Sequence, residues 1–243
     1  MSFYQSPYLP FMNLRNSYLA DFVNLLFPRL CQACNASLLG TEDLICTDCL
    51  YNLPYTNFHT QPGNIVAQQF WGKVELQQAY ALLYFEKGGK VQHLIHQFKY
   101  KGMPKIGNKL GTIAGEQLLS VVSVKPVDYI IPVPLHKSRL RERGFNQSTH
   151  FAQGLASKLK ATVSEHNLIR TVKTDTQTHK NRFARYQNMQ QVFAVKHPEL
   201  LEGKHILLVD DIVTTGSTLE ACAQELLKVP GVTLSIATIA YAL

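Results

Sequence analysis

Long apolar runs are absent from this sequence of 243 residues. A helix that crosses a membrane needs about 18 or more consecutive apolar residues, and no segment reaches that length. The first ten residues also lack the basic stretch of a secretory signal, and Arg15, Asp21 and Asn24 interrupt the apolar residues that follow. We therefore expect no transmembrane segment and a cytoplasmic location.

The same N-terminal stretch does have a helical pattern. Apolar residues recur at helical spacing from Tyr18 to Leu26, and Pro28 ends the pattern. The polar face is poor in Lys and Arg, which argues against a helix that lies on an anionic membrane. We expect residues 1–28 to form an N-terminal helical segment that docks on the protein.

Acidic residues are fewer than basic ones, with 17 Asp and Glu against 24 Lys and Arg. The resulting net charge of +7 and the pI near 9.1 favour anionic partners such as nucleic acids or polyphosphates, although a soluble basic surface has the same composition. The hydrophobic content of 46% is sufficient for a packed core. The length allows one large domain, or one domain and a small module.

Only five residues are cysteines, and four of them form two Cys-x-x-Cys knuckles. Cys31 and Cys34 are separated from Cys46 and Cys49 by the eleven residues 35–45. Two such knuckles can supply the four thiolates of a tetrahedral Zn²⁺ site, so we expect a structural zinc ribbon over residues 29–55. Two disulfides are the alternative, which a cytosolic location disfavours. The fifth, Cys222, lies on the apolar stripe of a predicted helix, where a buried and unreactive thiol is expected.

The remainder of the chain alternates between strand and helix patterns. Residues 56–73 are polar, contain the turn Pro62–Gly63 and are expected to be a connector. From residue 74 the alternation predicts an α/β domain that extends to residue 243. Strands are predicted over residues 80–85, 129–134, 168–172, 191–195, 206–209 and 232–240, and helices over residues 91–98, 108–122 and 147–159.

The most informative segment follows the predicted strand 206–209. Asp210 and Asp211 come at the end of that strand, and a short hydroxyl-rich loop leads into a helix; the loop residues are Thr214, Thr215, Gly216, Ser217 and Thr218. Such a loop at a helix N-terminus offers backbone N–H groups, hydroxyl groups and the positive end of the helix dipole to an anion. The adjacent carboxylates are suited to the hydroxyl groups of a sugar, with or without a metal. Together these features predict a site for ribose 5-phosphate.

This segment resembles the 5-phosphoribosyl-1-pyrophosphate (PRPP) motif of type I phosphoribosyltransferases. The resemblance implies that Asp210 and Asp211 hold the ribose, with Mg²⁺ accompanying PRPP, and that Thr214–Thr218 hold the 5-phosphate. Three simpler interpretations remain: the magnesium site of a nucleoside triphosphatase, an acidic strand end of a receiver-like domain, or a helix cap. The first normally needs a Gly-x-x-x-x-Gly-Lys-[Ser/Thr] loop, which the sequence lacks.

Two further segments suit a pyrophosphate. Val133, Pro134 and Leu135 follow the strand predicted from Tyr129, and the resemblance implies that this loop presents backbone N–H groups to the pyrophosphate. The basic run 137–143 contributes Arg139 and Arg141, which favour a mobile lid over the phosphates. The alternatives are a proline-capped strand end and a solvated basic helix.

Other basic residues are candidates for DNA contacts. Lys99 and Lys101 flank Tyr100 at a predicted helix end, where they serve either the helix dipole or a single strand. Arg139, Arg141 and Arg143 are the other candidates. The polar segment 174–188 suits either a hood over an acceptor pocket or a solvated helix.

The order of the motifs along the chain resembles that of the ComF family. These motifs are the two cysteine knuckles, Phe98–Gly102, Pro132–His136, Arg139–Gln147 and the Asp-Asp motif. This resemblance implies a type I phosphoribosyltransferase-like parallel sheet flanked by helices, preceded by the Cys₄ zinc ribbon. It also implies PRPP binding and the handling of incoming single-stranded DNA during natural transformation, with DNA-uptake proteins as further partners. The alternative function is an active PRPP-dependent glycosyltransferase of nucleobase or nucleotide metabolism. No residue is identified as catalytic, so the sequence leaves enzymatic activity open.

Overall fold

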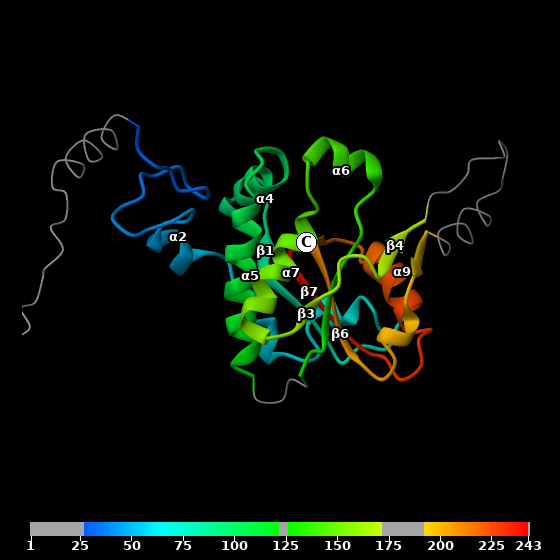
Figure 1. The fold of residues 1–243 in the computed structure, drawn as a ribbon. Coiled ribbons are helices and arrows are strands. Elements are labelled where there is room, and N and C mark those ends of the chain that lie inside the picture. Colours follow the sequence, from blue (N-terminus) through cyan, green and yellow to red (C-terminus); the bar gives the residue numbers. More distant parts are fainter. Residues whose placement is uncertain (1–26, 122–125, 172–191, 243) are drawn as a thin grey trace, which may run out of the picture.

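A computed structural model describes residues 27–121, 126–171 and 192–242 (Figure 1). The helix expected before Pro28 and the polar segment 174–188 therefore lie outside the described residues. Within the described ranges, none of the helices has the length and apolar character that a bilayer crossing requires.

The core of the protein is a five-stranded sheet with the order β1-β7-β6-β2-β3, in which every neighbouring pair is parallel. The central strands are nearly continuous runs of buried apolar residues, as expected for a parallel sheet covered on both faces. The strands are β1 (Gln78–Phe85), β2 (Tyr129–Pro132), β3 (Thr162–Val163), β6 (His205–Val213) and β7 (Thr233–Ala242). A separate antiparallel pair consists of β4 (Leu168–Arg170) and β5 (Phe193–Val195).

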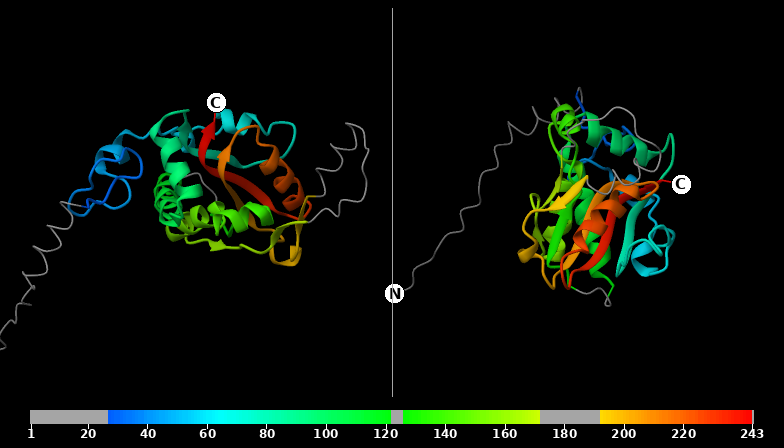
Figure 2. Two further views of the ribbon diagram at one scale, coloured as in Figure 1. Left: turned by 90° about the horizontal axis from the view of Figure 1, so that it is seen from above. Right: turned by 90° about the vertical axis from the view of Figure 1, so that its right-hand side faces the viewer.

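Helices cover both faces of this sheet (Figures 1 and 2). On one face lie α4 (Lys90–Tyr100), α5 (Pro104–Leu119) and α7 (Gln147–Leu159), and α9 (Ser217–Leu226) lies on the other. The short elements are α2 (Thr47–Asn52), η1 (Phe58–Thr60), α3 (Ile65–Gln68), α6 (Lys137–Arg143) and η2 (Pro198–Leu200). The predicted α/β class and parallel sheet are thus confirmed.

Helices α5 and α7 approach each other unusually closely. A Cβ atom on Gly111 would collide with the carbonyl oxygen of Phe151, and one on Gly154 would collide with the carbonyl oxygen of Asn108. The two backbones therefore touch at these glycines. This contact fixes α7, whose first residues face the carboxyl ends of the strands.

The strand order places a topological switch point between β2 and β6. These strands are neighbours, but the chain leaves β2 towards β3 and leaves β6 towards β7, in opposite directions across the sheet. In open α/β sheets, ligands bind beyond the carboxyl ends of the strands at such a switch point. The segments beginning at Val133 and Asp210 both lie at that edge.

Strand β6 is longer than predicted, and the reason lies in its two neighbours. Pairing with β2 ends at Val209, opposite Pro132, whereas pairing with β7 continues to Val213, opposite Tyr241. Asp210 therefore lies within β6, where β2 no longer covers one side of the strand. The prediction that the strand ends at Val209 was therefore wrong. Val209 is instead the last residue of β6 that pairs with β2.

Residues 56–73, expected to be a connector, are folded against the sheet. The N–H group of Thr56 donates to the carbonyl of Leu82 in β1 at 3.1 Å. Phe58, Val66 and Phe70 are buried. This segment lies on the same side of the sheet as α9, because Lys73 forms an ion pair with Glu220 of α9 at 3.5 Å.

Candidate functional site

The loop between β6 and α9 brings the predicted phosphate-binding residues together. Gly216 adopts a left-handed backbone conformation, with φ of 74°, and precedes the first residue of α9 without a side-chain cap. The hydroxyl groups of Thr215 and Ser217 lie 3.0 Å apart. The first N–H groups of a helix have no partner within it, so this loop presents backbone donors beside the hydroxyl groups. A small hollow is lined by Asp210 and residues 212–219.

The two carboxylates next to this hollow have different surroundings. Asp210 Oδ1 accepts hydrogen bonds from the backbone N–H of Asp211 at 2.8 Å and from the hydroxyl of Ser148 at 2.9 Å. Burial and the neighbouring charge of Asp211 raise the pKa of Asp210 to about 7, although these hydrogen bonds oppose the shift. Asp211 forms an ion pair with Lys99, with Nζ and Oδ2 2.7 Å apart and both side chains only 15% exposed.

The position of Lys99 changes its expected role. From the sequence we grouped Lys99 with Lys101 as candidates for DNA contacts. In the structure α4 ends beside the acidic pair, where Lys99 bonds to Asp211, while Lys101 is exposed. Sequence analysis also missed Ser148, because nothing in its neighbourhood in the chain indicates contact with a residue 62 positions later.

The loop after β2 is held by two hydrogen bonds. The N–H of Val133 donates to the carbonyl of Val209 at 2.9 Å, and the side-chain amide of Asn146 donates to the carbonyl of Val133 at 3.0 Å. Pro134 has no N–H group. Of the three residues expected to bind pyrophosphate, Leu135 is therefore the one whose N–H these contacts leave for a ligand.

The basic run after this loop forms the short helix α6. His136 caps its start by accepting a hydrogen bond from the N–H of Ser138, and left-handed Gly144 ends it. No residue of α6 is buried. Asn146 caps the next helix by accepting a hydrogen bond from the N–H of Ser148 at 3.2 Å.

Arg143 is the most enclosed residue of α6. One guanidinium nitrogen donates to Gln147 Oε1 at 2.8 Å, and the group lies 5.5 Å from the ring centre of Tyr100. The Nε atom of Arg143 is buried, and the described residues provide it with no hydrogen-bond partner.

The acidic pair, Lys99, Ser148, Thr218 and the loop after β2 line one cleft of about 480 Å³ at the switch point. Arg139 and Arg143 line this cleft, whereas Arg141 is exposed and is not among its lining residues. A second cleft, of about 640 Å³, lies between α6 and the β4–β5 pair and shares part of its lining with the first. The first cleft is lined by Lys99, Val133, Pro134, Leu135, His136, Arg139, Arg143, Gln147, Ser148, Arg170, Asp210, Asp211, Ile212 and Thr218.

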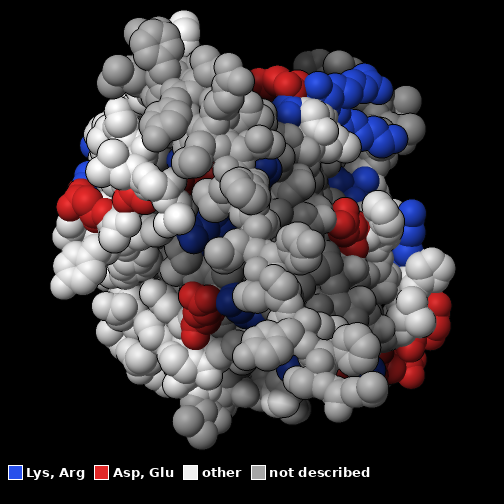
Figure 3. Space-filling model, turned by 60° about the vertical axis from the view of Figure 1, so that its left-hand side comes forward, with Lys and Arg blue, Asp and Glu red and all other residues white. Residues whose placement is uncertain are grey.

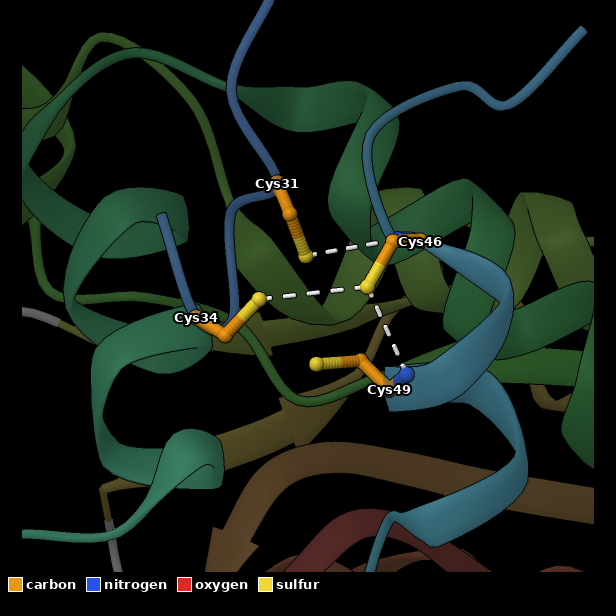
Figure 4. Close-up of side chains that lie close together, drawn as sticks. All are labelled: Cys31, Cys34, Cys46 and Cys49. Atoms are coloured by element: carbon orange, nitrogen blue, oxygen red, sulfur yellow. Dashed lines mark hydrogen bonds between the residues drawn. The ribbon is translucent and has the colours of Figure 1, made fainter. Parts of the chain in front are cut away.

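The four knuckle cysteines come together as predicted (Figure 4). Their sulfur atoms all lie within 4.8 Å of one another. Backbone N–H groups of Ala33 and Cys46 point at the sulfur of Cys31, at 3.4 and 3.3 Å. Burial opposes ionisation of Cys31, but these N–H groups bring its pKa down to about 7. Four clustered sulfurs with N–H donors suit a tetrahedral Zn²⁺ ion.

This cysteine cluster contacts the main domain through α4. Lys90 forms an ion pair with Asp48 at 3.5 Å, and His93 Nδ1 lies 3.3 Å from the carbonyl oxygen of Ala33. The same helix carries Lys99 at its other end.

Comparisons with known proteins agree with this architecture. Residues 146–242 match the phosphoribosyl transferase domain family. The chain is 30% identical over 203 residues to DNA utilization protein YhgH of Escherichia coli K12, covering 82% of this chain and 84% of that protein. It is 28% identical over 225 residues to competence protein F of Haemophilus influenzae, covering 90% of this chain and 93% of that protein.

Among solved structures, the chain resembles the glutamine PRPP amidotransferase of B. subtilis, with a TM-score of 0.40 and 18% identity. That likeness covers 58% of this chain and 30% of the other. The coverage and identity of the YhgH relative show the family, and the four-cysteine cluster and the phosphoribosyl transferase match fit it. The chain therefore belongs to the ComF/YhgH family of competence proteins with a phosphoribosyltransferase domain.

Proposed function

We propose that the protein binds PRPP with Mg²⁺ in the cleft between β2 and β6. The loop 214–218 receives the 5-phosphate, and Asp210 and Asp211 receive the ribose hydroxyl groups. Leu135 and Arg139 face the pyrophosphate from the other side. The observation that carries this proposal is that an anion-binding loop, an acidic pair and two arginines line neighbouring walls at the switch point.

We further propose that this ligand site serves the handling of incoming single-stranded DNA in the cytoplasm during natural transformation. The names of the two relatives, a DNA utilization protein and a competence protein, support this role. The net charge of +7 supports it as well. On the face shown in Figure 3, Lys and Arg side chains gather along the upper right edge.

The DNA surface that we propose consists of Lys101 and the three arginines of α6. Arg139 and Arg141 are exposed. The exposed ring of Tyr100 contacts both Arg143 and His96, and the ring centres of Tyr100 and His96 are 5.2 Å apart. Cations beside an exposed aromatic ring suit both the phosphates and the bases of a single strand. Lys99 is left out of this surface because it is paired with Asp211.

The zinc ribbon has a structural role in this proposal. So small a module has too little core to fold without a metal. Its exposed Leu39 and Tyr51 are available to a protein of the DNA-uptake machinery.

The second candidate function is a PRPP-dependent glycosyltransferase. The cleft of about 640 Å³ beside the first one favours it, because this cleft offers space for an acceptor next to the proposed PRPP site. In such a reaction the bond from C1 of the ribose to pyrophosphate breaks while the acceptor attacks, and positive charge develops on the sugar. Asp210 and Asp211 would stabilise that charge, and positioning would supply most of the rate.

PRPP binding is tested by titrating PRPP and Mg²⁺ into the wild type and the Asp210→Asn/Asp211→Asn double variant. We expect binding in the micromolar range, an order-of-magnitude figure of about −8 kcal/mol, and its loss in the variant. Thermal unfolding of the double variant controls for folding. Equal binding by the two proteins would refute the assignment of the acidic pair.

The two functions are separated by two further measurements. DNA handling predicts that affinity for single strands falls steeply with salt and falls when Arg139, Arg141 and Arg143 are all changed to Gln. An affinity that is the same at low and physiological salt would exclude it. Pyrophosphate release in a screen of nucleobases, nucleotides and DNA would instead establish the glycosyltransferase.

A further inference from the structure

The segment that follows α3 forms the outer support of the phosphate-binding loop. The side-chain amide of Gln69 donates to the carbonyl of Thr214 at 2.9 Å. The buried ring of Phe70 would lie 3.1 Å from a Cβ atom on Gly216, and Lys73 pairs with Glu220 in the first turn of α9. Three contacts in five residues thus follow the loop from its start into the helix. None of these supporting residues lies within the 146–242 match.

This segment is itself fixed to the sheet. Asn64 caps α3 by accepting hydrogen bonds from the N–H groups of Val66 and Ala67, at 3.0 and 3.1 Å. Its amide group donates to the carbonyl of Ala79 in β1 at 2.8 Å, and Asn64 is buried. The sheet therefore holds one end of the segment, and the other end holds the loop.

The bond from Gln69 determines which way a peptide group of the loop faces. In a planar trans peptide, the C=O of one residue and the N–H of the next point in opposite directions. Because Gln69 holds the carbonyl of Thr214, the N–H of Thr215 points away from Gln69; Thr214 and Thr215 line the hollow, and Gln69 is not among its lining residues. We propose that Gln69 is a positioning residue for the 5-phosphate, acting through the Thr214–Thr215 peptide. This inference rests on the proposed PRPP site.

Folding alone does not account for Gln69. Its Oε1 atom is buried, and the part of the chain that the structure describes gives it no hydrogen-bond partner. A buried acceptor without a partner destabilises a fold, and its removal offsets the loss of the solvent-exposed bond from Gln69 to the Thr214 carbonyl, so an apolar side chain of similar length would be at least as favourable there. A role in folding and a role in positioning therefore predict opposite effects of such a replacement on stability.

The test compares Gln69→Met with Gln68→Met. Gln68 is a matched control, because its amide also donates to a backbone carbonyl at 2.9 Å, but to that of Gly63, away from the loop. Calorimetric titrations use ribose 5-phosphate and inorganic pyrophosphate as separate probes. We expect Gln69→Met to weaken ribose 5-phosphate binding about tenfold. The variant loses the bond that orients the Thr214–Thr215 peptide, and a tenfold change corresponds to about one hydrogen bond to a charged group. Pyrophosphate binding should be unchanged, as should both affinities in Gln68→Met.

Thermal unfolding supplies the second readout. We expect the melting temperature of Gln69→Met to equal or exceed that of the wild type. A lower melting temperature, with the affinities for both probes reduced equally, would show a structural role and overturn the proposal. Equal affinities of Gln69→Met and Gln68→Met for ribose 5-phosphate would also overturn it. If the wild type binds neither PRPP nor ribose 5-phosphate, the proposed PRPP site is refuted. The inference about Gln69 is then refuted as well, by a result that does not depend on the variants.

Discussion

The two walls of the ligand cleft are built in opposite ways. The inner wall, residues 210–218, continues the buried strand β6, and it is held by pairing with β7, by Ser148 and by Gln69 and Phe70. The outer arm, residues 136–144, is the short helix α6 with a cap at each end and no buried residue. One wall continues a core strand and is supported by its neighbours, and the other stands outside the core.

This difference indicates that the two walls contribute differently to ligand binding. A group held in place before a ligand arrives loses little conformational entropy on binding and discriminates by geometry. An exposed arginine must be ordered by the ligand and contributes a screened, salt-dependent attraction. We therefore expect the inner wall to decide which sugar phosphate binds, and the outer arm to add charge for any polyanion.

The largest effect should come from distorting the inner wall. Gly216 and Gly144 have nearly the same left-handed backbone, with φ of 74° and 78°. A Cβ on Gly216 would meet the ring of Phe70 at 3.1 Å, whereas one on Gly144 would meet nothing within 4 Å. Both valine variants bear a strain of about 1–3 kcal/mol, but only Gly216→Val should also displace the loop.

We expect Gly216→Val to reduce PRPP affinity about 100-fold, the equivalent of about 3 kcal/mol. Gly144→Val should reduce it by no more than about threefold, although it frays the end of α6. Calorimetry gives the affinities, and circular dichroism shows whether each variant is folded. Similar losses in the two variants would remove the distinction between the walls.

The next effect concerns charge on the outer arm. Arg139 lines the cleft and Arg141, two residues away, does not. Arg139→Gln should weaken PRPP binding about tenfold and make it less dependent on salt, since a charge-assisted bond to phosphate is worth about 1.5–3 kcal/mol. Arg141→Gln should leave PRPP binding unchanged. Titrations at two salt concentrations measure both quantities, and a greater loss in Arg141→Gln would reverse the assignment of the arm.

A smaller effect is expected from Lys99, the cation that pairs with the inner wall. Lys99 is 15% exposed and bonds to Asp211, while Lys101 is exposed. Lys99→Met should lower the melting temperature by a few degrees, because it leaves two adjacent carboxylates without their cation. Lys101→Met should not change it. Differential scanning calorimetry checks both, and equal melting temperatures would mean that the ion pair contributes nothing to folding.

The smallest effect is a dependence on pH. Burial, together with the charge of Asp211, raises the pKa of Asp210 to about 7, above its ordinary value of about 4. The fold thus favours the protonated carboxyl, whose contribution to stability is complete below pH 4 and is lost as the pH rises through about 7. Asp210→Asn, which stays neutral, should melt a few degrees above the wild type at pH 8. The gain should disappear towards pH 4, and a gain that is constant with pH would contradict the raised pKa.

Much of the inner wall could be predicted because its parts are contiguous. A buried strand, two acids, a hydroxyl-rich loop and a helix start follow one another in the sequence, so their proximity is local. The contributions of Lys99, Ser148 and Gln69 could not be predicted, because each comes from a distant segment through the packing of helices on the sheet.

Two other features depended on tertiary contacts in the same way. The polar composition of residues 56–73 indicated a connector, but Phe58, Val66 and Phe70 are irregularly spaced and buried against other elements. The sequence predicted that the N–H of Val133 faces a pyrophosphate, but this N–H completes the ladder between β2 and β6 by donating to the carbonyl of Val209. Neither contact leaves a periodic pattern in the sequence.

The close contact of α5 and α7 also bears on protein engineering. Replacing a glycine inside a helix with alanine is a common way to raise thermostability, because it restricts the unfolded chain. At Gly111 and Gly154 the added methyl group would collide with the opposite backbone and push α7 away from α5. Ser148, which donates to Asp210, would shift with α7. A stabilised variant should therefore keep both glycines. The first turn of α7 lines the cleft through Gln147 and Ser148, so the spacing between α5 and α7 affects the shape of the cleft.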